Sequence, residues 1–316
     1  MKFLFISPRF SGGIGGHASM LAEQLTNVGH EVTKMQTPHI PIKNLKNPSF
    51  ALFGALKAVI SREQYDIVHA FNVPSAFAMH YAKGKKKVLS VHGMFSDQVS
   101  ALHSKAISSV ARDTESKVLK WADSLTTDSK ITQKIYKEKT GLNFEYLPSA
   151  IDSDKLDMID DVEKNINQII YLGRDSFEKG IDILKKIESD LNGNVVYCTN
   201  LSWSDAMIEL KKSAILVVPS RMESLPTNIK EAFYFKIPVV ATNVGGIPEL
   251  ISNNHTGILV PSEDYSKLID AINKILFDAK LRDSLSNEAH RFIIENMTWK
   301  KILPKYVNFY KNLLTT

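Results

Sequence analysis

The chain has a single cysteine, Cys198, in 316 residues. One cysteine cannot form an intrachain disulfide and excludes a multi-cysteine metal site, a pattern that suits a reducing compartment. Long apolar runs are also missing. The N-terminal "MKFLFISPRF" has four apolar residues in a row before Ser7, too few for a signal-peptide core, and no run of about 18 apolar residues could span a bilayer. We therefore expect a cytoplasmic protein.

Charge is distributed unevenly along the chain. Residues 1–150 contain nineteen Lys and Arg against eleven Asp and Glu, a net charge of +8, whereas residues 151–316 contain twenty against twenty-three, a net charge of −3. The "KGKKK" run at 83–87 supplies much of the excess, together with Lys43, Lys46, Lys57 and Arg62. The excess indicates either an ordinary solvated surface or contact with anionic lipid or an acidic substrate.

Short apolar, β-branched runs alternate with helical patterns in both halves. Continuous apolar strands separated by helices are typical of parallel sheets that helices cover on both faces. A length above that of one ordinary core also favours two domains. We predict two doubly wound α/β domains, connected by the polar stretch 149–165. The predicted strands are 3–7, 66–71, 87–93, 124–129 and 144–148, then 168–174, 194–198, 214–220, 238–243 and 257–261.

A glycine-rich loop, "SGGIGGH" (11–17), follows the first strand and opens a helix. Gly13, Gly15 and Ala18 fit the G-x-G-x-x-A pattern, in which backbone N–H groups approach a phosphate at a helix N-terminus. A nicotinamide enzyme would need an acidic residue at the end of the second strand. Here Glu31 lies at the start of that strand and Lys34 lies near its end. The loop therefore indicates a phosphate site of another kind or simply a tight turn.

Other strand ends carry charged side chains, and ligands of open α/β sheets bind at such ends. In "YLGRDSFEKG" (171–180), Arg174 ends a strand and Lys179 begins a helix, so both cations can converge on one diphosphate. His92 ends the strand "KVLSVHG", and His69 in "DIVHAF" is expected at the same edge. Each histidine is either structural or functional.

Two glutamates flank a predicted helix start in "ESLPTNIKE" (223–231). Glu223 lies in the preceding loop and Glu231 lies about one turn into the helix. Pro226 is expected at the first helical position, where no N–H is needed, and the amides near Leu225 and Thr227 would point at an anion. The alternative is an N-capping acid followed by an ordinary i,i+4 helix partner.

Taken together, the motifs resemble a known family. They are "GGIGG", "VHG" at 91–93, "GR" with "KG" at 173–180, "PSRMESLPTNIKEAFYFKIPVVATNVGGIPELI" at 219–251 and "TGILV" at 256–260. In this order they resemble the retaining family-four glycosyltransferases, or glycosyl transferases group 1, of the GT-B fold. The resemblance covers nearly the whole chain and is strongest from 171 to 261.

The resemblance implies an α/β fold of two Rossmann-like, doubly wound parallel-sheet domains facing a central cleft. Residues 1–150 would bind the acceptor and residues 151–297 the nucleotide sugar, and a C-terminal helix, 298–316, would cross back to the N-terminal domain. The implied activity is retaining, hexosyltransferase-type transfer from a nucleotide diphosphate sugar, such as a UDP- or GDP-sugar. The acceptor would be a glycan, a lipid-linked or a small molecule, as in polysaccharide biosynthesis. No cofactor, metal or nucleic acid is expected. Peripheral contact of the N-terminal domain with an anionic membrane is expected.

The resemblance also assigns roles to residues. His92 would lie beside the donor sugar, Arg174 and Lys179 would stabilise the leaving diphosphate, and Glu223 would reach the sugar hydroxyls. Glu231 would take the ribose hydroxyls. No nucleophile is assigned, because the leaving phosphate would assist attack from the same face. The remaining donor-binding residues implied are Gly13, Gly15, Gly16, Ser224, Leu225, Pro226 and Thr227.

Some features depart from the family pattern. The segment 199–213 omits a Gly-Asp-Gly turn and a strand that relatives carry near the nucleobase. The sequence therefore does not indicate which nucleobase the donor carries. Lys236 occupies a position where glycine is usual. "DSD" at 152–154 fits the D-x-D metal motif of the other large glycosyltransferase fold, but it lies in the predicted connection. The rival interpretations are an inactive nucleotide-binding subunit and a nicotinamide-dependent oxidoreductase.

Overall fold

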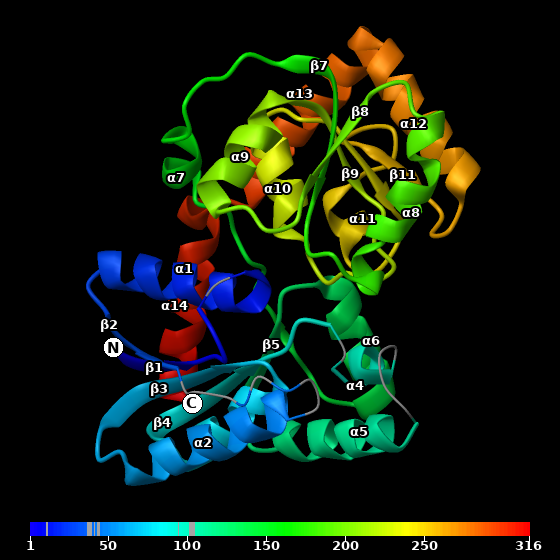
Figure 1. The fold of residues 1–316 in the computed structure, drawn as a ribbon. Coiled ribbons are helices and arrows are strands. Elements are labelled where there is room, and N and C mark those ends of the chain that lie inside the picture. The colour runs from blue at the N-terminus through cyan, green and yellow to red at the C-terminus, as the bar shows by residue number, and fades with distance from the viewer. Residues whose placement is uncertain (11, 37–39, 41, 43–44, 94, 101–104) are drawn as a thin grey trace. The chain divides into compact units, whose positions relative to one another are not determined.

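The computed structural model describes the chain except residues 11, 37–39, 41, 43–44, 94 and 101–104 (Figure 1). It divides into two compact units. Unit 1 comprises Met1–Ser149 and Ile302–Thr316, and unit 2 comprises Ala150–Lys301. Each unit contains one sheet, and all strand pairs described within the two sheets are parallel, as the alternation of apolar strands and helices predicts.

Unit 1 is built on a six-stranded sheet in the order β2-β1-β3-β4-β5-β6. Central strands β1 and β3 are almost wholly buried, because helices cover both faces. The strands are β1 (Lys2–Ile6), β2 (Glu31–Met35), β3 (Gln64–Phe71), β4 (Lys83–Ser90), β5 (Ser124–Thr127) and β6 (Glu145–Tyr146). The helices are α1 (Gly13–Asn27), α2 (Lys46–Ile60), α3 (Ala76–Tyr81), α4 (Phe95–Ser100), α5 (Lys105–Leu119) and α6 (Lys130–Thr140), with a 3-10 turn η1 (Val73–Ser75).

Unit 2 is built on a five-stranded sheet in the order β11-β10-β9-β7-β8. Its strands are β7 (Asn165–Leu172), β8 (Asn194–Cys198), β9 (Ser213–Val218), β10 (Val239–Thr242) and β11 (Ile258–Val260). Its helices are α7 (Ser153–Asp157), α8 (Ile181–Ile187), α9 (Trp203–Lys212), α10 (Thr227–Tyr234), α11 (Ile247–Leu250), α12 (Tyr265–Phe277) and α13 (Ala279–Asn296), with 3-10 turns η2 (Phe177–Lys179) and η3 (Glu188–Asp190).

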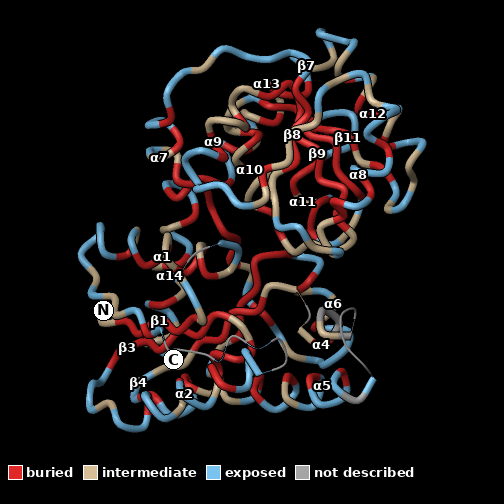
Figure 2. Tube along the Cα trace, viewed as in Figure 1, coloured by how far each residue is buried: buried red, intermediate tan, exposed pale blue. Residues whose placement is uncertain are grey.

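The central strand of unit 2 shows why these segments form a covered sheet. All six residues of β9 are buried (Figure 2). Successive side chains of a strand point to opposite faces of its sheet. Leu216 and Val218 join an apolar cluster with α9 and α10, whereas Ile215 and Val217 join another with α8 and α12. The strands therefore end at fixed positions between two packed layers, and the loops that follow them are held in place.

The lysine run at 83–87 lies in β4, so the prediction that this strand begins at Lys87 is wrong by four residues. Gly84 packs so closely on β3 that a Cβ there would lie 2.5 Å from Val68 Cγ2. Lys85 Nζ binds Asp66 at 2.7 Å, and Lys87 Nζ donates to a backbone carbonyl. Long lysine stems let a basic sequence pair as a strand while the charges reach the surface.

The C-terminal helix α14 (Trp299–Thr315) begins within unit 2, and its residues from Ile302 onward belong to unit 1. Two buried tyrosines hold it there. Tyr306 Oη donates to Leu147 O at 2.8 Å, and Tyr310 Oη lies 2.7 Å from His69 Nδ1. The stretch 149–165, predicted as a connection, contains α7 and contributes the buried Leu156 to unit 2. Over the part of the chain that the structure describes, none of the helices has the length and apolar character needed to cross a membrane.

Candidate active site

In unit 2, the loop after β9 meets the turn after β7 at an ion pair between Glu223 and Lys179. The Glu223 carboxylate accepts hydrogen bonds from Lys179 Nζ at 2.7 Å and from Ser220 Oγ at 2.8 Å. The Glu223 side chain is 6% exposed and the Lys179 side chain is 25% exposed. Two residues predicted from the sequence thus meet directly, with the carboxylate closed to water and the ammonium group partly open to it.

Two glycines hold the loops that carry this ion pair. Gly180 has φ +67°, and a Cβ there would lie 2.0 Å from Pro219 O. Gly245 has φ +52°, and a Cβ there would lie 1.8 Å from Glu223 O. Each position combines a left-handed backbone with an approach that leaves no room for a side chain, so only glycine fits without moving the loop.

Arg221 braces the same loops. Its guanidinium donates to both carboxylate oxygens of Asp182, at 2.7 and 2.8 Å, to Phe177 O at 2.7 Å, and also to Glu263. Its Cζ lies 3.9 Å from the centroid of the Phe177 ring. Hydrogen bonding to Asp182 raises the pKa of Arg221 further above its usual range. Arg221 was not predicted as a site residue, because its partners are distant along the chain.

Arg174 lies two residues beyond β7 and does not share a partner with Lys179. Its Nη2 binds Glu178 Oε1 at 2.9 Å, and its side chain is 64% exposed. Tyr171 Oη donates to Arg174 O at 2.7 Å and so fixes the backbone at this point. In this structure the two cations are paired with different carboxylates, and their convergence on one diphosphate stays a prediction.

Helix α10 begins one residue later than predicted. Pro226 has extended ψ and acts as the N-cap, so Thr227 is the first helical residue. Leu225 is buried, and Ser224 beside it is half-buried. Asn228 Nδ2 donates to Leu172 O at 2.8 Å, which ties the start of the helix to the end of β7. The N-terminus of α10 is therefore fixed at the carboxyl edge of the sheet.

Glu231 lies one turn inside α10, as predicted. Its Oε1 accepts a hydrogen bond from Trp203 Nε1 at 2.9 Å. Burial raises the pKa of Glu231 above its ordinary value, while the Trp203 hydrogen bond and the charge of Lys230 act in the opposite direction. Trp203 is the first residue of α9 and is 45% exposed. The segment 199–213 departs from the family pattern, but no local pattern in it predicts the contact of Trp203 with Glu231.

In unit 1, the tight turn into α1 accounts for most of the glycines in the loop 11–17. Gly12 and Gly13 have φ values of +57° and +44°, and Gly16 N bonds to Gly12 O at 3.0 Å in the first turn of α1. A Cβ on Gly15 would lie 2.2 Å from Arg9 O. These glycines let α1 start tightly against the end of β1. Donor binding by Gly13, Gly15 and Gly16 stays a prediction.

His92, two residues beyond β4, lies against Asp128, which follows β5. His92 Nδ1 and Asp128 Oδ2 are 3.1 Å apart, and the two side chains are 13% and 3% exposed. Strand register explains the contact, because Ser90 pairs with Thr126, and His92 and Asp128 each lie two residues further on. The His17 ring from α1 is 5.5 Å away, centroid to centroid. Asp128 was not predicted as a site residue, although "TTDS" ends a predicted strand.

His69 lies inside β3 and is not at the edge of the sheet, so its predicted place is wrong. Its role is structural. It is fully buried within β3, where Nδ1 meets Tyr310 Oη at 2.7 Å and Nε2 meets Ser90 Oγ at 2.7 Å. Burial lowers the pKa of His69 to about 3. A neutral imidazole satisfied at both nitrogens anchors α14 to the sheet.

The "DSD" motif caps a helix. Asp152 is the N-cap of α7, and its Oδ1 accepts from Lys155 N at 3.2 Å. Lys155 Nζ also lies 3.6 Å from the other oxygen of Asp152. Over the described residues, no cluster of three or more His, Cys, Asp or Glu side chains is arranged to hold a metal ion.

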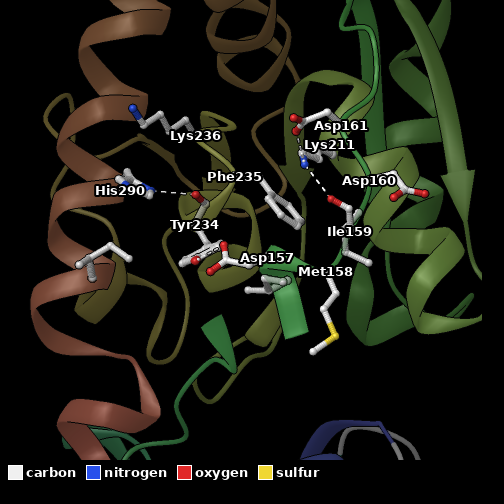
Figure 3. Close-up of a pocket in the computed structure, with 12 residues that line it drawn as sticks. Asp157, Met158, Ile159, Asp160, Asp161, Lys211, Tyr234, Phe235, Lys236 and His290 are labelled. Carbon is white, nitrogen blue, oxygen red and sulfur yellow. Dashed lines mark hydrogen bonds and ion pairs between the residues drawn. The ribbon is translucent and has the colours of Figure 1, made fainter. Parts of the chain in front are cut away.

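A cavity of about 690 Å³ lies at the C-terminal end of α10 (Figure 3). Lys211 Nζ crosses it to Ile159 O at 2.9 Å, and Tyr234 Oη donates to Asp157 at 2.6 Å. Lys236, on its wall, has φ +55°, the left-handed conformation that favours glycine after a helix. The residues lining this cavity include none of the predicted site residues.

Comparison with known proteins defines the class. Two parallel-sheet units of this kind match solved GT-B glycosyltransferases. Sucrose-phosphate synthase from Thermosynechococcus elongatus superposes with a TM-score of 0.81 at 16% identity, over 99% of each chain. HepE from Anabaena, in complex with UDP-glucose, superposes with a TM-score of 0.76 at 15% identity, over 99% of this chain and 100% of that one. These matches confirm the predicted fold.

Sequence comparison gives the family. The model of Glycosyltransferase Family 4 matches residues 11–155, and the model of Glycosyl transferases group 1 matches residues 184–292. An uncharacterized glycosyltransferase of Methanocaldococcus jannaschii is 24% identical over 96% of this chain and 95% of its own length. The N-acetyl-alpha-D-glucosaminyl L-malate synthase of Bacillus anthracis is 22% identical over 96% and 94%. The chain belongs to the group 1 glycosyltransferases of the GT-B fold, which favours the transferase interpretation over the nicotinamide oxidoreductase.

Proposed function

We propose that this chain is a retaining glycosyltransferase that moves a hexose-type sugar from a nucleotide diphosphate sugar to a glycan, a lipid-linked or a small-molecule acceptor. One observation carries the proposal. Glu223 just before α10 and Glu231 one turn inside it present two carboxylates along one helix start, and the first is ion-paired with Lys179. This spacing suits the hydroxyls of a sugar and of a ribose on either side of a diphosphate.

The diphosphate would take the cations and the start of α10. Lys179 is partly open to water, and the exposed i,i+4 pair of Arg174 with Glu178 is of a kind worth about 0–1 kcal/mol, so exchanging Glu178 for a phosphate costs little. The N-terminus of α10 adds the positive end of the helix dipole, although the Ile229 N–H in its first turn is already bonded to Asn228 Oδ1 at 2.9 Å. Together these groups would stabilise the charge of the leaving group without a divalent metal.

The proposed reaction needs no protein nucleophile. The acceptor oxygen forms a bond to the anomeric carbon on the face from which the bond to the diphosphate oxygen breaks. The acceptor proton passes to that departing oxygen, so atoms and charge balance and the anomeric configuration is retained. His92, held by Asp128, would orient a substrate hydroxyl in this step.

The names of similar proteins support a nucleotide-sugar donor and leave the acceptor broad. HepE was solved with UDP-glucose, and CapM of Staphylococcus aureus, 24% identical over 48% of this chain, is a capsular polysaccharide biosynthesis glycosyltransferase. The expected cytoplasmic location and membrane contact stay predictions, as does the identity of the nucleobase.

A thermal-shift panel of UDP, GDP, ADP and NADH tests the donor class, because a ligand that binds the folded state raises the melting temperature. We expect one nucleotide diphosphate to raise it and NADH to leave it unchanged. A shift with NADH alone would contradict the proposal.

Donor turnover in EDTA tests whether the reaction needs a metal ion. We expect turnover to persist, and loss in EDTA with recovery on adding Mn²⁺ would overturn metal independence.

The remaining alternative is an inactive subunit that binds nucleotide without turnover. The intact pairing of Lys179 with Glu223, and the glycines at Gly180 and Gly245 that leave no room for a side chain beside it, argue against loss of function. Donor hydrolysis or transfer by the purified chain separates the two possibilities, since an inactive subunit would show the thermal shift and no turnover.

A further inference from the structure

Glu115 on α5 is a buried carboxylate that the proposed reaction does not use. It is 3% exposed, and it accepts hydrogen bonds from Phe95 N at 3.0 Å through Oε1 and from Ser96 N at 3.1 Å through Oε2. Tyr136 Oη also donates to Oε1. Helices α4 and α6, which carry these donors, lie beside α5 (Figure 1). One carboxylate thus joins three helices of unit 1.

An ionised carboxylate is an unfavourable way to fill buried space. Its removal from water opposes folding, and apolar side chains of similar size often give equal or greater stability. The carboxylate does offer one thing that its amide lacks. Both of its oxygens accept, so Glu115 holds two successive backbone N–H groups side by side, whereas glutamine would turn its NH2 group toward one of them. The charge therefore serves to fix the backbone at Phe95 and Ser96.

The two residues that begin α4 lie three and four positions after His92. The chain turns at Gly93, which has φ +77°. Before the histidine, Val91 N bonds to Thr126 O at 3.0 Å. The end of β5 therefore fixes the chain on one side of His92, and Glu115 fixes it on the other.

The third donor to this carboxylate lies on the helix that follows Asp128. Ser129, the next residue, is the N-cap of α6. Tyr136 of this helix is fully buried, and its ring stacks on an aromatic neighbour with the centroids 4.3 Å apart. Its hydroxyl group donates to Glu115 from this fixed position. Glu115 is therefore bonded both to the segment that carries His92 and to the helix that begins beside Asp128.

We propose that Glu115 is a positioning residue, which keeps His92 against Asp128 by tying α4 to α6. Without this tie the loop after β4 can move relative to α6, and the 3.1 Å contact between His92 Nδ1 and Asp128 Oδ2 lengthens. The consequence for turnover rests on the proposed function, in which His92 orients a substrate hydroxyl. A misplacement of about 1 Å in such a group lowers a rate by up to about a hundredfold.

A double-mutant cycle on donor turnover tests this role. We expect Glu115→Gln to lower kcat about ten- to a hundredfold and to leave the nucleotide diphosphate affinity unchanged. If Glu115 acts through the contact of His92 with Asp128, Glu115→Gln should lower kcat by less than about threefold further in the Asp128→Asn background. Effects that multiply would overturn the proposal, because they would show that the two residues act independently. Asp113→Asn, at an exposed position on α5, is the matched control and should leave kcat unchanged.

A proton resonance of the His92 ring separates this inference from the proposed function. In the wild type the Nδ1 proton, bonded to Asp128 in a mostly buried site, should give a slowly exchanging downfield line that is absent in His92→Gln. We expect the line to vanish in Glu115→Gln. An unchanged line there, or no such line in the wild type, would overturn the proposal. No donor turnover by the wild type, with the line lost in Glu115→Gln, would contradict the proposed function and support the positioning role.

Tyr136→Phe is a second variant, which tests the proposal even if Glu115→Gln fails to fold. It keeps the stacked ring and removes only the donor to Glu115. We expect kcat to fall about three- to tenfold, with little further loss in the Asp128→Asn background. An unchanged kcat together with an unchanged His92 line in folded Tyr136→Phe would overturn the proposal.

Discussion

Glu231 is a carboxylate in a place that disfavours its charge. Burial raises its pKa, and Trp203 compensates only in part. An acid whose pKa is raised on folding binds more protons in the folded state, so the free protein gains stability as the pH falls toward that raised pKa and loses it at neutral pH. Such a cost is typical of a group that serves a ligand, and the ribose hydroxyls of the proposed donor would donate hydrogen bonds to this carboxylate.

Glu231→Gln should therefore weaken binding while sparing the fold. The amide oxygen can still accept from Trp203, but ribose loses a charged acceptor, so we expect about tenfold weaker nucleotide diphosphate binding and a smaller change in kcat. At neutral pH the melting temperature without ligand should be unchanged or higher. Titration calorimetry measures the nucleotide diphosphate affinity and thermal unfolding measures the melting temperature. Glu295→Gln, at an exposed position on α13, is the control. Unchanged affinity with a lower melting temperature would reduce Glu231 to a structural residue.

Glu223→Gln should lower kcat and leave nucleotide binding intact. Its contact is proposed to lie where positive charge develops on the sugar, so kcat should fall about a hundredfold. The affinity for the free nucleotide diphosphate, which has no sugar, should stay nearly unchanged. Steady-state kinetics and calorimetry on the same preparation give the comparison. Loss of nucleotide affinity with normal kcat would reverse the roles given to the two glutamates.

At the scale of elements, the loop after β9 depends on Gly245. A Cβ there would lie 1.8 Å from Glu223 O, whereas Gly141, also at positive φ, has nothing within 4 Å of its Cβ position. Gly141→Ala therefore isolates the cost of a left-handed backbone, about 1–2 kcal/mol. We expect Gly245→Ala to lose clearly more stability in urea unfolding and to lower donor turnover as well. Equal losses, with turnover intact in both variants, would show that the loop does not need its close packing.

Strands β4 and β5 together position His92 through Asp128. Asp128→Asn keeps the shape but removes the charge that holds the imidazole, and we expect a 10–100-fold fall in kcat with unchanged nucleotide binding. Asp123→Asn is the matched control, because Asp123 flanks the other end of β5 and accepts from Lys87 N at 2.6 Å. Asp123→Asn should lower the stability of the fold and leave kcat unchanged. A normal kcat in Asp128→Asn would remove Asp128 from the site.

Much of this arrangement follows from local sequence. Apolar runs predict the covered strands, and the strand ends then indicate the loops that carry Arg174, Lys179 and Glu223. Other features depend on pairs that no local pattern shows. Trp203 meets Glu231 across 28 positions, and Arg221 meets Asp182 across 39. The early start of β4 also escaped prediction, because its lysines look polar in sequence although their stems pack.

For the whole molecule, the chain combines two parallel-sheet units with a marked charge asymmetry. Unit 2 carries the paired Lys179 and Glu223 and the glutamate on α10, and unit 1 carries His92 with Asp128. The positive first half includes α2, on which Lys46 and Lys57 are exposed.

The central claim is that the cluster around Lys179 and Glu223 drives departure of a nucleotide diphosphate from a sugar. The most direct test is the release of nucleotide diphosphate from a panel of UDP- and GDP-sugars by the purified chain. We expect release from at least one donor, and a fall of about two to three powers of ten in Lys179→Gln, which can still donate to Glu223 and keep the fold. Undiminished release by a folded Lys179→Gln protein, or no release from any donor by the wild type, would contradict the account.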